Sequence, residues 1–99
     1  MEVKEKINNN ELTLSIKGRL DTLTSNDLDA KILDLSEDIK TLILDMTELD
    51  YISSAGLRVL AKAHKIVENK QGKMIIKNVN TAVMSIFKMT GFNTILTIE

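Results

Sequence analysis

The sequence predicts an α/β domain: a mixed β-sheet, with an N-terminal hairpin followed by parallel strands, covered by about three to four helices. Three observations lead to this fold class. Alternating apolar residues open the chain, short uninterrupted apolar runs follow, and segments of helical periodicity separate those runs. Because a strand–helix–strand crossover returns the chain in the same direction, the later strands should run parallel to one another.

The hairpin is predicted from the first 17 residues. Met1–Ile7 alternates weakly, Asn8–Asn10 is a cluster of turn residues, and Glu11–Lys17 alternates cleanly with Leu12, Leu14 and Ile16 on one side. The segment Gly18–Asp21 then interrupts the alternation.

Helices and buried strands alternate through the remainder, giving the order β-β-α-β-α-β-α-β. Thr24, Ser25 or Asn26 can cap the first helix, which carries Leu28, Ile32 and Leu35 at helical spacing. The later elements expected are a strand at 42–44, a helix at 54–69, a strand at 74–76, a helix at 81–90 with Gly91 as its C-cap, and a short strand or helix within 92–99, where residues 94–98 favour the strand.

Size and composition limit the class of protein. Ninety-nine residues suffice for one hydrophobic core, so we expect a single domain over residues 1–99. The formal net charge is −1, so the chain lacks the excess of positive charge that is typical of proteins that bind nucleic acid directly. No apolar run approaches the length of a membrane span and no signal-peptide pattern opens the chain, so we expect a cytoplasmic protein that does not enter the membrane. With no cysteine and a single histidine, His64, we expect no metal site and no cofactor.

The most informative segment is 45–60. A polar link after the apolar run at 42–44 leads to Tyr51 and Ile52, which we expect to be a buried pair, and then to two serines directly before a helical pattern. A hydroxyl is thus presented at a helix start, where backbone N–H groups are unpaired and the helix dipole favours negative charge. A phosphate added there would be held rather than repelled.

This segment resembles the phosphorylation site of STAS-domain anti-sigma factor antagonists. That family has a hydrophobic strand, a short acidic link, an aromatic–aliphatic pair and then Asp-Ser-Ser/Thr-Gly-Leu. The resemblance places Ser54 at the phosphorylated serine, with Ser53 where the family usually has Asp and Ala55 where it often has Ser or Thr; Gly56 and Leu57 match. Ser53 is an alternative phosphorylation site.

A second match is Gly18-Arg19-Leu20-Asp21, which is similar to the family's Gly-x-Leu/Ile-Asp turn. In the family this Asp lies on the partner-binding face, so the resemblance implies that role for Asp21. The implied partner-binding residues are together Asp21, Ser53, Ser54, Gly56, Leu57, Arg58 and Lys62.

The resemblance implies a partner switch rather than an enzyme. The unphosphorylated chain binds a GHKL-type serine kinase that acts as an anti-sigma factor, and so frees a sigma factor or another output protein. The kinase phosphorylates Ser54 and loses affinity, and a PPM-type serine phosphatase resets the switch. No catalytic residue is implied in this chain, and we expect it to be a monomer when free.

Simpler interpretations remain open for each site residue. Ser53 or Ser54 can merely cap the helix, Asp21 can serve a turn, and Gly56 can reflect tight packing of helix on sheet. Arg58, Lys62 and Lys65 share one side of the helix, either as a solvated face or as a docking surface for an acidic partner.

Other functional classes are weighed against the switch. A non-switching STAS interaction module of a transport or lipid-trafficking complex is the main alternative, and a scaffold subunit of a stress-signalling assembly is another. Asp45, Glu48 and Asp50 could suggest paired-acid catalysis, but they occupy one short link without a complementary base or metal ligands. His64 is expected to be a packed edge residue rather than a catalyst.

Overall fold

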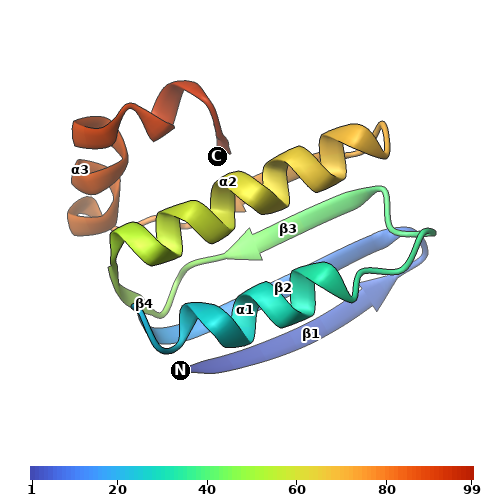
Figure 1. The fold of residues 1–99 in the computed structure, drawn as a ribbon, viewed down its shortest axis with the longest axis horizontal. Coiled ribbons are helices and arrows are strands. Elements are labelled where there is room, and N and C mark those ends of the chain that lie inside the picture. Colours follow the sequence, from blue (N-terminus) through green and yellow to red (C-terminus); the bar gives the residue numbers. More distant parts are fainter.

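The computed structural model describes all residues, Met1–Glu99, as one mixed sheet with three α-helices (Figure 1). The elements in chain order are β1 (Glu2–Asn8), β2 (Glu11–Leu20), α1 (Ser25–Leu33), β3 (Thr41–Asp45), β4 (Leu49–Ile52), α2 (Ser54–Asn69), β5 (Lys73–Lys77), α3 (Thr81–Thr90), a 3₁₀ turn (Phe92–Thr94) and β6 (Thr97–Ile98).

The sheet has the predicted mixed topology. The hairpin β1–β2 is antiparallel, whereas the pairs β2–β3, β3–β5 and β5–β6 are parallel, so the strand order is β1-β2-β3-β5-β6. The short strand β4 lies off this path and pairs in parallel with the last residues of β2. The expected fold class is therefore confirmed.

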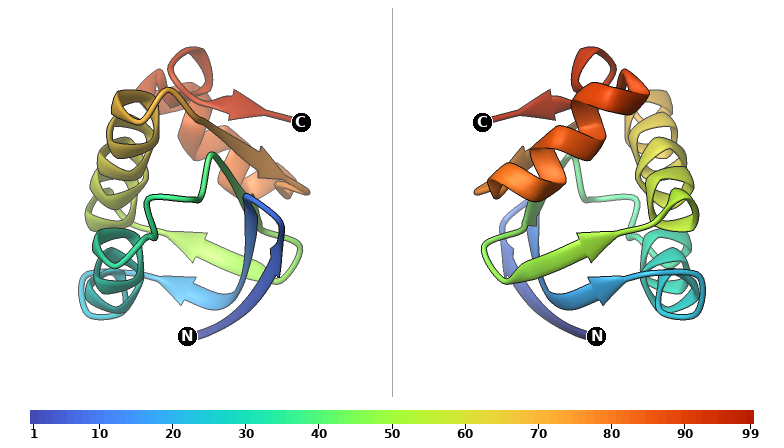
Figure 2. Two further views of the ribbon diagram at one scale, coloured as in Figure 1. Left: turned by 90° about the vertical axis from the view of Figure 1, so that its right-hand side faces the viewer. Right: turned by 90° about the vertical axis from the view of Figure 1, so that its left-hand side faces the viewer.

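One face of the sheet holds the core. On β2, Leu12, Leu14 and Ile16 are buried, while the alternate residues between them lie on the opposite face. Helices α1 and α2 lie side by side over the buried face, as both side views show (Figure 2). They bury Leu28 and Ile32 from α1, and Leu60, Ala63 and Val67 from α2, at helical spacing; Leu35, expected on the first helix, lies beyond the end of α1 at Leu33.

Helix α3 lies at one end of the sheet, against β4 (Figure 1). The Asn80 side chain caps it by accepting a hydrogen bond from the Val83 amide at 2.8 Å, and Gly91 ends it with the left-handed φ of 80° expected of a C-cap. Its buried residues are Val83 and Phe87. Met84 and Ile86, which are partly buried, also pack against the core.

Two strand assignments differ from the sequence prediction. Strand β2 continues past Lys17 to Leu20, because Gly18 adopts a left-handed φ of 99° and carries the chain through an irregular position. Strand β4 was not predicted, since the pairing jumps from Gly18–Leu49 to Arg19–Tyr51 and leaves Asp50 as an extra residue. Such a bulge disrupts the two-residue alternation by which strands are recognised.

The expectation that Tyr51 and Ile52 form a buried pair is wrong for Tyr51, which follows the bulge at Asp50. Ile52 is buried, but Tyr51 is 38% exposed, so the two are not a buried pair. At the C-terminus, the strand expected over 94–98 is confined to residues 97–98, because residues 92–94 form the 3₁₀ turn first.

Truncation of Phe87 tests the anchoring of α3. We expect Phe87→Ala to lower the free energy of unfolding by about 3–5 kcal/mol, because a fully buried ring leaves a cavity. Met89→Ala is the control on the same helix: Met89 is 84% exposed, so the change should stay within about 0.5 kcal/mol. Urea denaturation checks both, and equal effects would show that α3 does not pack as described.

Candidate functional site

The candidate site lies where β2 and β4 end. These strands are parallel, with Leu20 opposite Ile52, and the Ser53 amide donates a further hydrogen bond to the Leu20 carbonyl at 2.9 Å. Asp21 and Ser53, the residues that follow Leu20 and Ile52, are therefore brought to the same edge of the sheet. Two segments some 30 residues apart in the sequence, each predicted separately to belong to the site, meet here.

The two serines at the start of α2 have different roles. Ser53 is the N-cap: its Oγ accepts a hydrogen bond from the Gly56 amide at 3.4 Å, and its carbonyl accepts the first helical bond, from Leu57, at 3.0 Å. Ser54 is the first helical residue, is exposed, and its hydroxyl makes no hydrogen bond. The capping interpretation thus applies to Ser53, and the Ser54 hydroxyl is free to react.

Gly56 lets α2 approach the strands closely. A Cβ atom at this position would lie 2.8 Å from Cγ1 of Ile52, 2.9 Å from Cγ of Leu20 and 3.0 Å from the Leu20 carbonyl oxygen. Gly56 and its neighbour Leu57 are both buried. Close packing of helix on sheet therefore accounts for Gly56. Because Gly56 and Leu57 are buried, their role is to hold the first turn of α2, which carries Ser54, against the strands.

Asp21 organises the turn between β2 and α1. Its Oδ1 accepts hydrogen bonds from the Leu23 amide at 3.1 Å, the Thr24 amide at 3.0 Å and the Thr24 hydroxyl at 3.0 Å. These bonds, those from Thr24 foremost, hold the pKa of Asp21 below its ordinary value. The turn interpretation of Asp21 is thus observed, and this half-buried residue follows Leu20, whose carbonyl accepts the hydrogen bond from the Ser53 amide.

Three surface residues near the ends of β2 and β4 were not among the predicted site residues. The Arg19 guanidinium lies 4.4 Å from the centre of the Tyr51 ring, a cation–π contact between paired residues of β2 and β4. Leu23, in the Asp21 turn, is 80% exposed. An apolar residue inside a polar turn was a signal that could have identified Leu23; the Arg19–Tyr51 contact depends on a strand that the sequence did not reveal.

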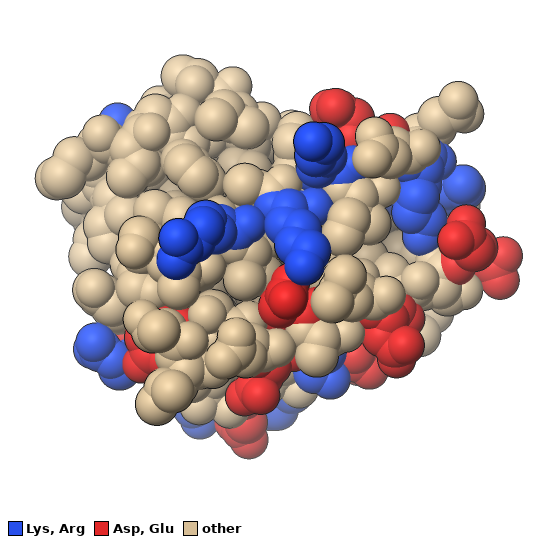
Figure 3. Space-filling view, viewed as in Figure 1, with Lys and Arg blue, Asp and Glu red and all other residues tan.

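The helical face divides into a basic and an acidic part. Arg58, Lys62 and Lys65 are exposed along α2, and Figure 3 shows basic side chains across the middle of this face with acidic ones below them, over α1. An open groove of about 410 Å³ separates the helices near Ser54; it is lined by Thr22, Ser25, Asn26, Asp29, Ala55, Arg58, Val59 and Lys62.

Lys62 and Asp29 bridge this groove. Lys62 Nζ lies 3.1 Å from Oδ1 of Asp29, a buried oxygen to which no aligned hydrogen bond is made, so the ammonium group acts as its counter-charge. Lys62 is consequently only partly available to a partner.

The three acids Asp45, Glu48 and Asp50 have separate partners or none. Asp45 Oδ1 accepts hydrogen bonds from the Thr47 hydroxyl at 2.6 Å and from the Asn78 side-chain Nδ2 at 3.1 Å, and these bonds hold the pKa of Asp45 below its ordinary value. Glu48 pairs with Lys17 at 3.8 Å, and Asp50 is exposed. The geometry does not make a pair of converging acids of the kind that paired-acid catalysis needs.

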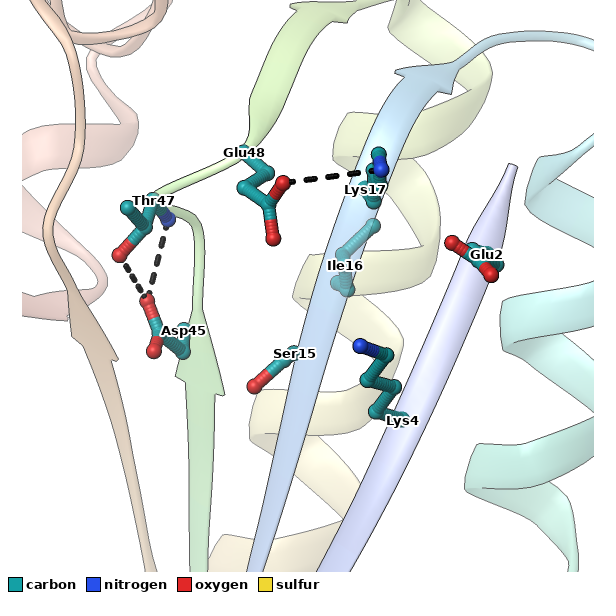
Figure 4. Close-up of a pocket in the computed structure, with 8 residues that line it drawn as sticks. All are labelled: Glu2, Lys4, Ser15, Ile16, Lys17, Asp45, Thr47 and Glu48. Carbon is teal, nitrogen blue, oxygen red and sulfur yellow. Dashed lines mark hydrogen bonds and ion pairs between the residues drawn. The ribbon is translucent and has the colours of Figure 1, made fainter.

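A second hollow, of about 210 Å³, lies on the face of the sheet away from α1 and α2 (Figure 4). Asp45, Glu48, Lys17, Lys4 and Ser15 are among its lining residues, and no predicted site residue is. His64 is half-buried and pairs with Glu68 at 3.4 Å, at the edge of α2.

Neither a membrane-spanning helix nor a cluster of metal ligands accompanies the site. None of the helices combines the length and apolarity needed to span a bilayer. No three His, Cys, Asp or Glu side chains gather in a geometry that could hold a metal ion.

Substitution of Gly56 tests the close approach of α2. We expect Gly56→Ala to lower the free energy of unfolding by about 1–3 kcal/mol, because the added methyl overlaps Ile52 and Leu20. Ser54→Ala, in the same turn of α2, should change it by less than about 0.5 kcal/mol, because the hydroxyl it removes is exposed and unbonded. A neutral or stabilising Gly56→Ala in urea denaturation would contradict the described packing.

Acid titration tests the Asp21 turn. Because the folded pKa of Asp21 is depressed, its contribution to stability is present above the ordinary value of 3.8 and is lost as the pH falls through the folded pKa. Asp21→Asn keeps an acceptor oxygen but removes the charge. We therefore expect its free energy of unfolding to fall less than that of the wild type between about pH 6 and pH 3. Parallel pH profiles from chemical denaturation would refute the carboxylate's role.

Comparison with known proteins agrees with this fold. The chain is 26% identical over 99 residues to the "Anti-sigma-B factor antagonist" of Bacillus subtilis (strain 168), a match that covers 100% of this chain and 91% of that protein. Two solved structures of the Bacillus protein SpoIIAA, an anti-sigma factor antagonist, share the fold at 17% identity. Its unphosphorylated form matches with a TM-score of 0.79 over 99% of this chain and 87% of that one, and its phosphorylated form with 0.78 over 99% and 91%.

The family itself follows from the sequence match. The family model described as "STAS domain" matches residues 1–99, a range that includes every helix and strand of the fold. The expectation drawn from Tyr51–Leu57 and Gly18–Asp21 is confirmed at the level of the family: the chain belongs to the STAS domain family.

Proposed function

We propose that this protein is an anti-sigma factor antagonist whose partner binding is switched off by phosphorylation of Ser54. The single observation that carries the proposal is the state of the Ser54 hydroxyl, which is exposed, unbonded and placed at the start of α2, at the edge of the sheet where β2 and β4 end. The antagonist names of its relatives support the regulatory role.

The proposed partner is a GHKL-type serine kinase that acts as an anti-sigma factor. The exposed and half-buried members of the site would contact it: Asp21, Ser53, Ser54, Arg58 and Lys62. Gly56 and Leu57 would contribute indirectly, by fixing the height at which the first turn of α2 lies above the strands. Binding of the kinase by this chain would release the sigma factor or other output protein that the kinase holds.

The phosphoryl transfer needs no catalytic group from this chain. The Ser54 Oγ attacks the γ-phosphorus of ATP in the kinase; a new Oγ–P bond forms while the bond to the bridging oxygen of the departing ADP breaks. The hydroxyl proton passes to a base on the kinase. The product carries about −1.5 to −2 additional charges at pH 7. A loss of binding energy of only about 1.4 kcal/mol at the interface lowers affinity tenfold.

Phosphorylation would change the surface and leave the fold intact. Both forms of SpoIIAA match this chain almost equally well, with TM-scores of 0.79 and 0.78, so that protein keeps this fold with and without the phosphate. A PPM-type phosphatase would hydrolyse the phosphoserine and restore the binding-competent surface.

Intact-mass spectrometry tests the site of modification. The protein and its variants are incubated with ATP in lysate of the native cells. We expect one added phosphate on the wild type and none on Ser54→Ala. Ser53→Ala is the matched control and should still be phosphorylated, because the Ser53 hydroxyl serves the helix cap.

The remaining outcomes separate the alternatives. Loss of the phosphate in Ser53→Ala but not in Ser54→Ala would move the site to Ser53. If none of the three proteins is modified in a lysate with active kinases, the switch is wrong and a non-switching STAS interaction module is the better description.

A further inference from the structure

The cation closest along α2 to Ser54 is not engaged by the protein itself. Arg58 follows Ser54 by four residues on the same helix, is exposed, and takes part in no ion pair and no side-chain hydrogen bond. The two neighbouring cations differ from it. Arg19 stacks on Tyr51 and lies 4.0 Å from Asp21, and Lys62 pairs with Asp29 at 3.1 Å.

The helix places Arg58 on the same side as Ser54. Residues four apart on an α-helix are surface neighbours, about 5–6 Å apart at their Cβ atoms, and the pair is most favourable when the acidic member precedes the basic one. A phosphate on Ser54 would be that preceding acidic member. Arg58 also lines the groove between α1 and α2, where the acid Asp29 is already matched by Lys62.

The chemistry of the two groups is complementary. A guanidinium is planar and can donate two parallel hydrogen bonds to two oxygens of one phosphate, which makes this pairing stronger than a contact between neutral groups. Lys65, the next exposed cation along α2 after Lys62, is eleven residues from Ser54 and too far away to make such a contact.

We propose that Arg58 is the intramolecular ligand of the phosphate on Ser54. This inference rests on the proposed phosphorylation of Ser54 and adds how this chain would hold the product. In the unphosphorylated protein Arg58 is a free cation on the partner-binding surface. In the phosphorylated protein it is bound to the phosphate, so one modification both adds negative charge and withdraws a positive group from a partner.

The test uses the full chain with phosphoserine incorporated at position 54 during synthesis, so that no kinase is needed. The probe is the phosphate's own ³¹P resonance, titrated with pH at about 0.15 M ionic strength, where the Debye length is about 8 Å. A nearby guanidinium favours the dianion. We therefore expect the second phosphate pKa, ordinarily about 6, to be higher in Arg58→Gln than in the unsubstituted phosphoprotein by about 0.3 unit, a twofold change in proton affinity.

Lys65→Gln is the matched control, because it removes the same charge from the same helix three turns away. It should leave the phosphate pKa within about 0.1 unit, because exposed charges at that distance are largely screened. As a second measurement, the Nε–H resonance of Arg58 should shift when position 54 carries phosphoserine instead of serine.

Equal shifts in the two variants, or an unmoved Arg58 resonance, would overturn the proposal. The pKa comparison and the Arg58 resonance can both be measured whether or not a cellular kinase modifies Ser54. If no cellular kinase modifies Ser54, the chemically installed phosphate still reports on Arg58. If Ser54 is modified but Arg58→Gln leaves its phosphate unchanged, only the role of Arg58 is wrong.

Discussion

The site depends on the parallel pairing of the end of β2 with β4, and on the close approach of α2 to these two strands at Gly56. Leu20 and Ile52 lie opposite each other, the Ser53 amide bonds to the Leu20 carbonyl, and the missing side chain of Gly56 allows α2 to rest on both. This arrangement brings the Asp21 turn and the first turn of α2 to the same edge of the sheet. Without the close approach at Gly56, α2 would begin farther from the sheet, and Ser54 would be displaced from the edge at which the Asp21 turn lies.

The same contact explains how one serine is committed to the fold while its neighbour is free. Ser53 accepts the Gly56 amide bond and so closes the helix start, which leaves Ser54 as the first residue that faces outward. In the family pattern an Asp occupies the Ser53 position, and both residue types are effective N-caps. The departure at Ser53 therefore preserves the capping bond, and what it alters is the charge presented beside Ser54.

Most of the fold could be predicted from the sequence, because its regular elements carry regular patterns. The alternation of Leu12, Leu14 and Ile16 and the helical spacing of Leu60, Ala63 and Val67 both correspond to buried faces. The site was predicted less completely. Strand β4 contains a bulge at Asp50 that cancels its alternation, so its pairing with β2 could not be read from the sequence. The Arg19–Tyr51 contact and the groove beside α1 follow from that pairing and from the helix packing, which depend on residues distant in the chain.

The structure around Ser54 is suited to a switch that acts by changing surface charge and not by changing the fold. The hydrogen bonds that hold the Asp21 turn and the Ser53 cap are local, and the core beneath them is closed, so a group added at Ser54 has no buried contact to disrupt. What it can change is the surface, where Arg58 and Lys62 follow the serine along α2 and where Arg19 and Asp21 lie at the end of β2. Arg19 and Lys62 are already paired with acids of this chain, so their response to a new phosphate should be weak. Arg58 has no such partner, and its free guanidinium is therefore the group through which a modification at Ser54 can act most directly on binding.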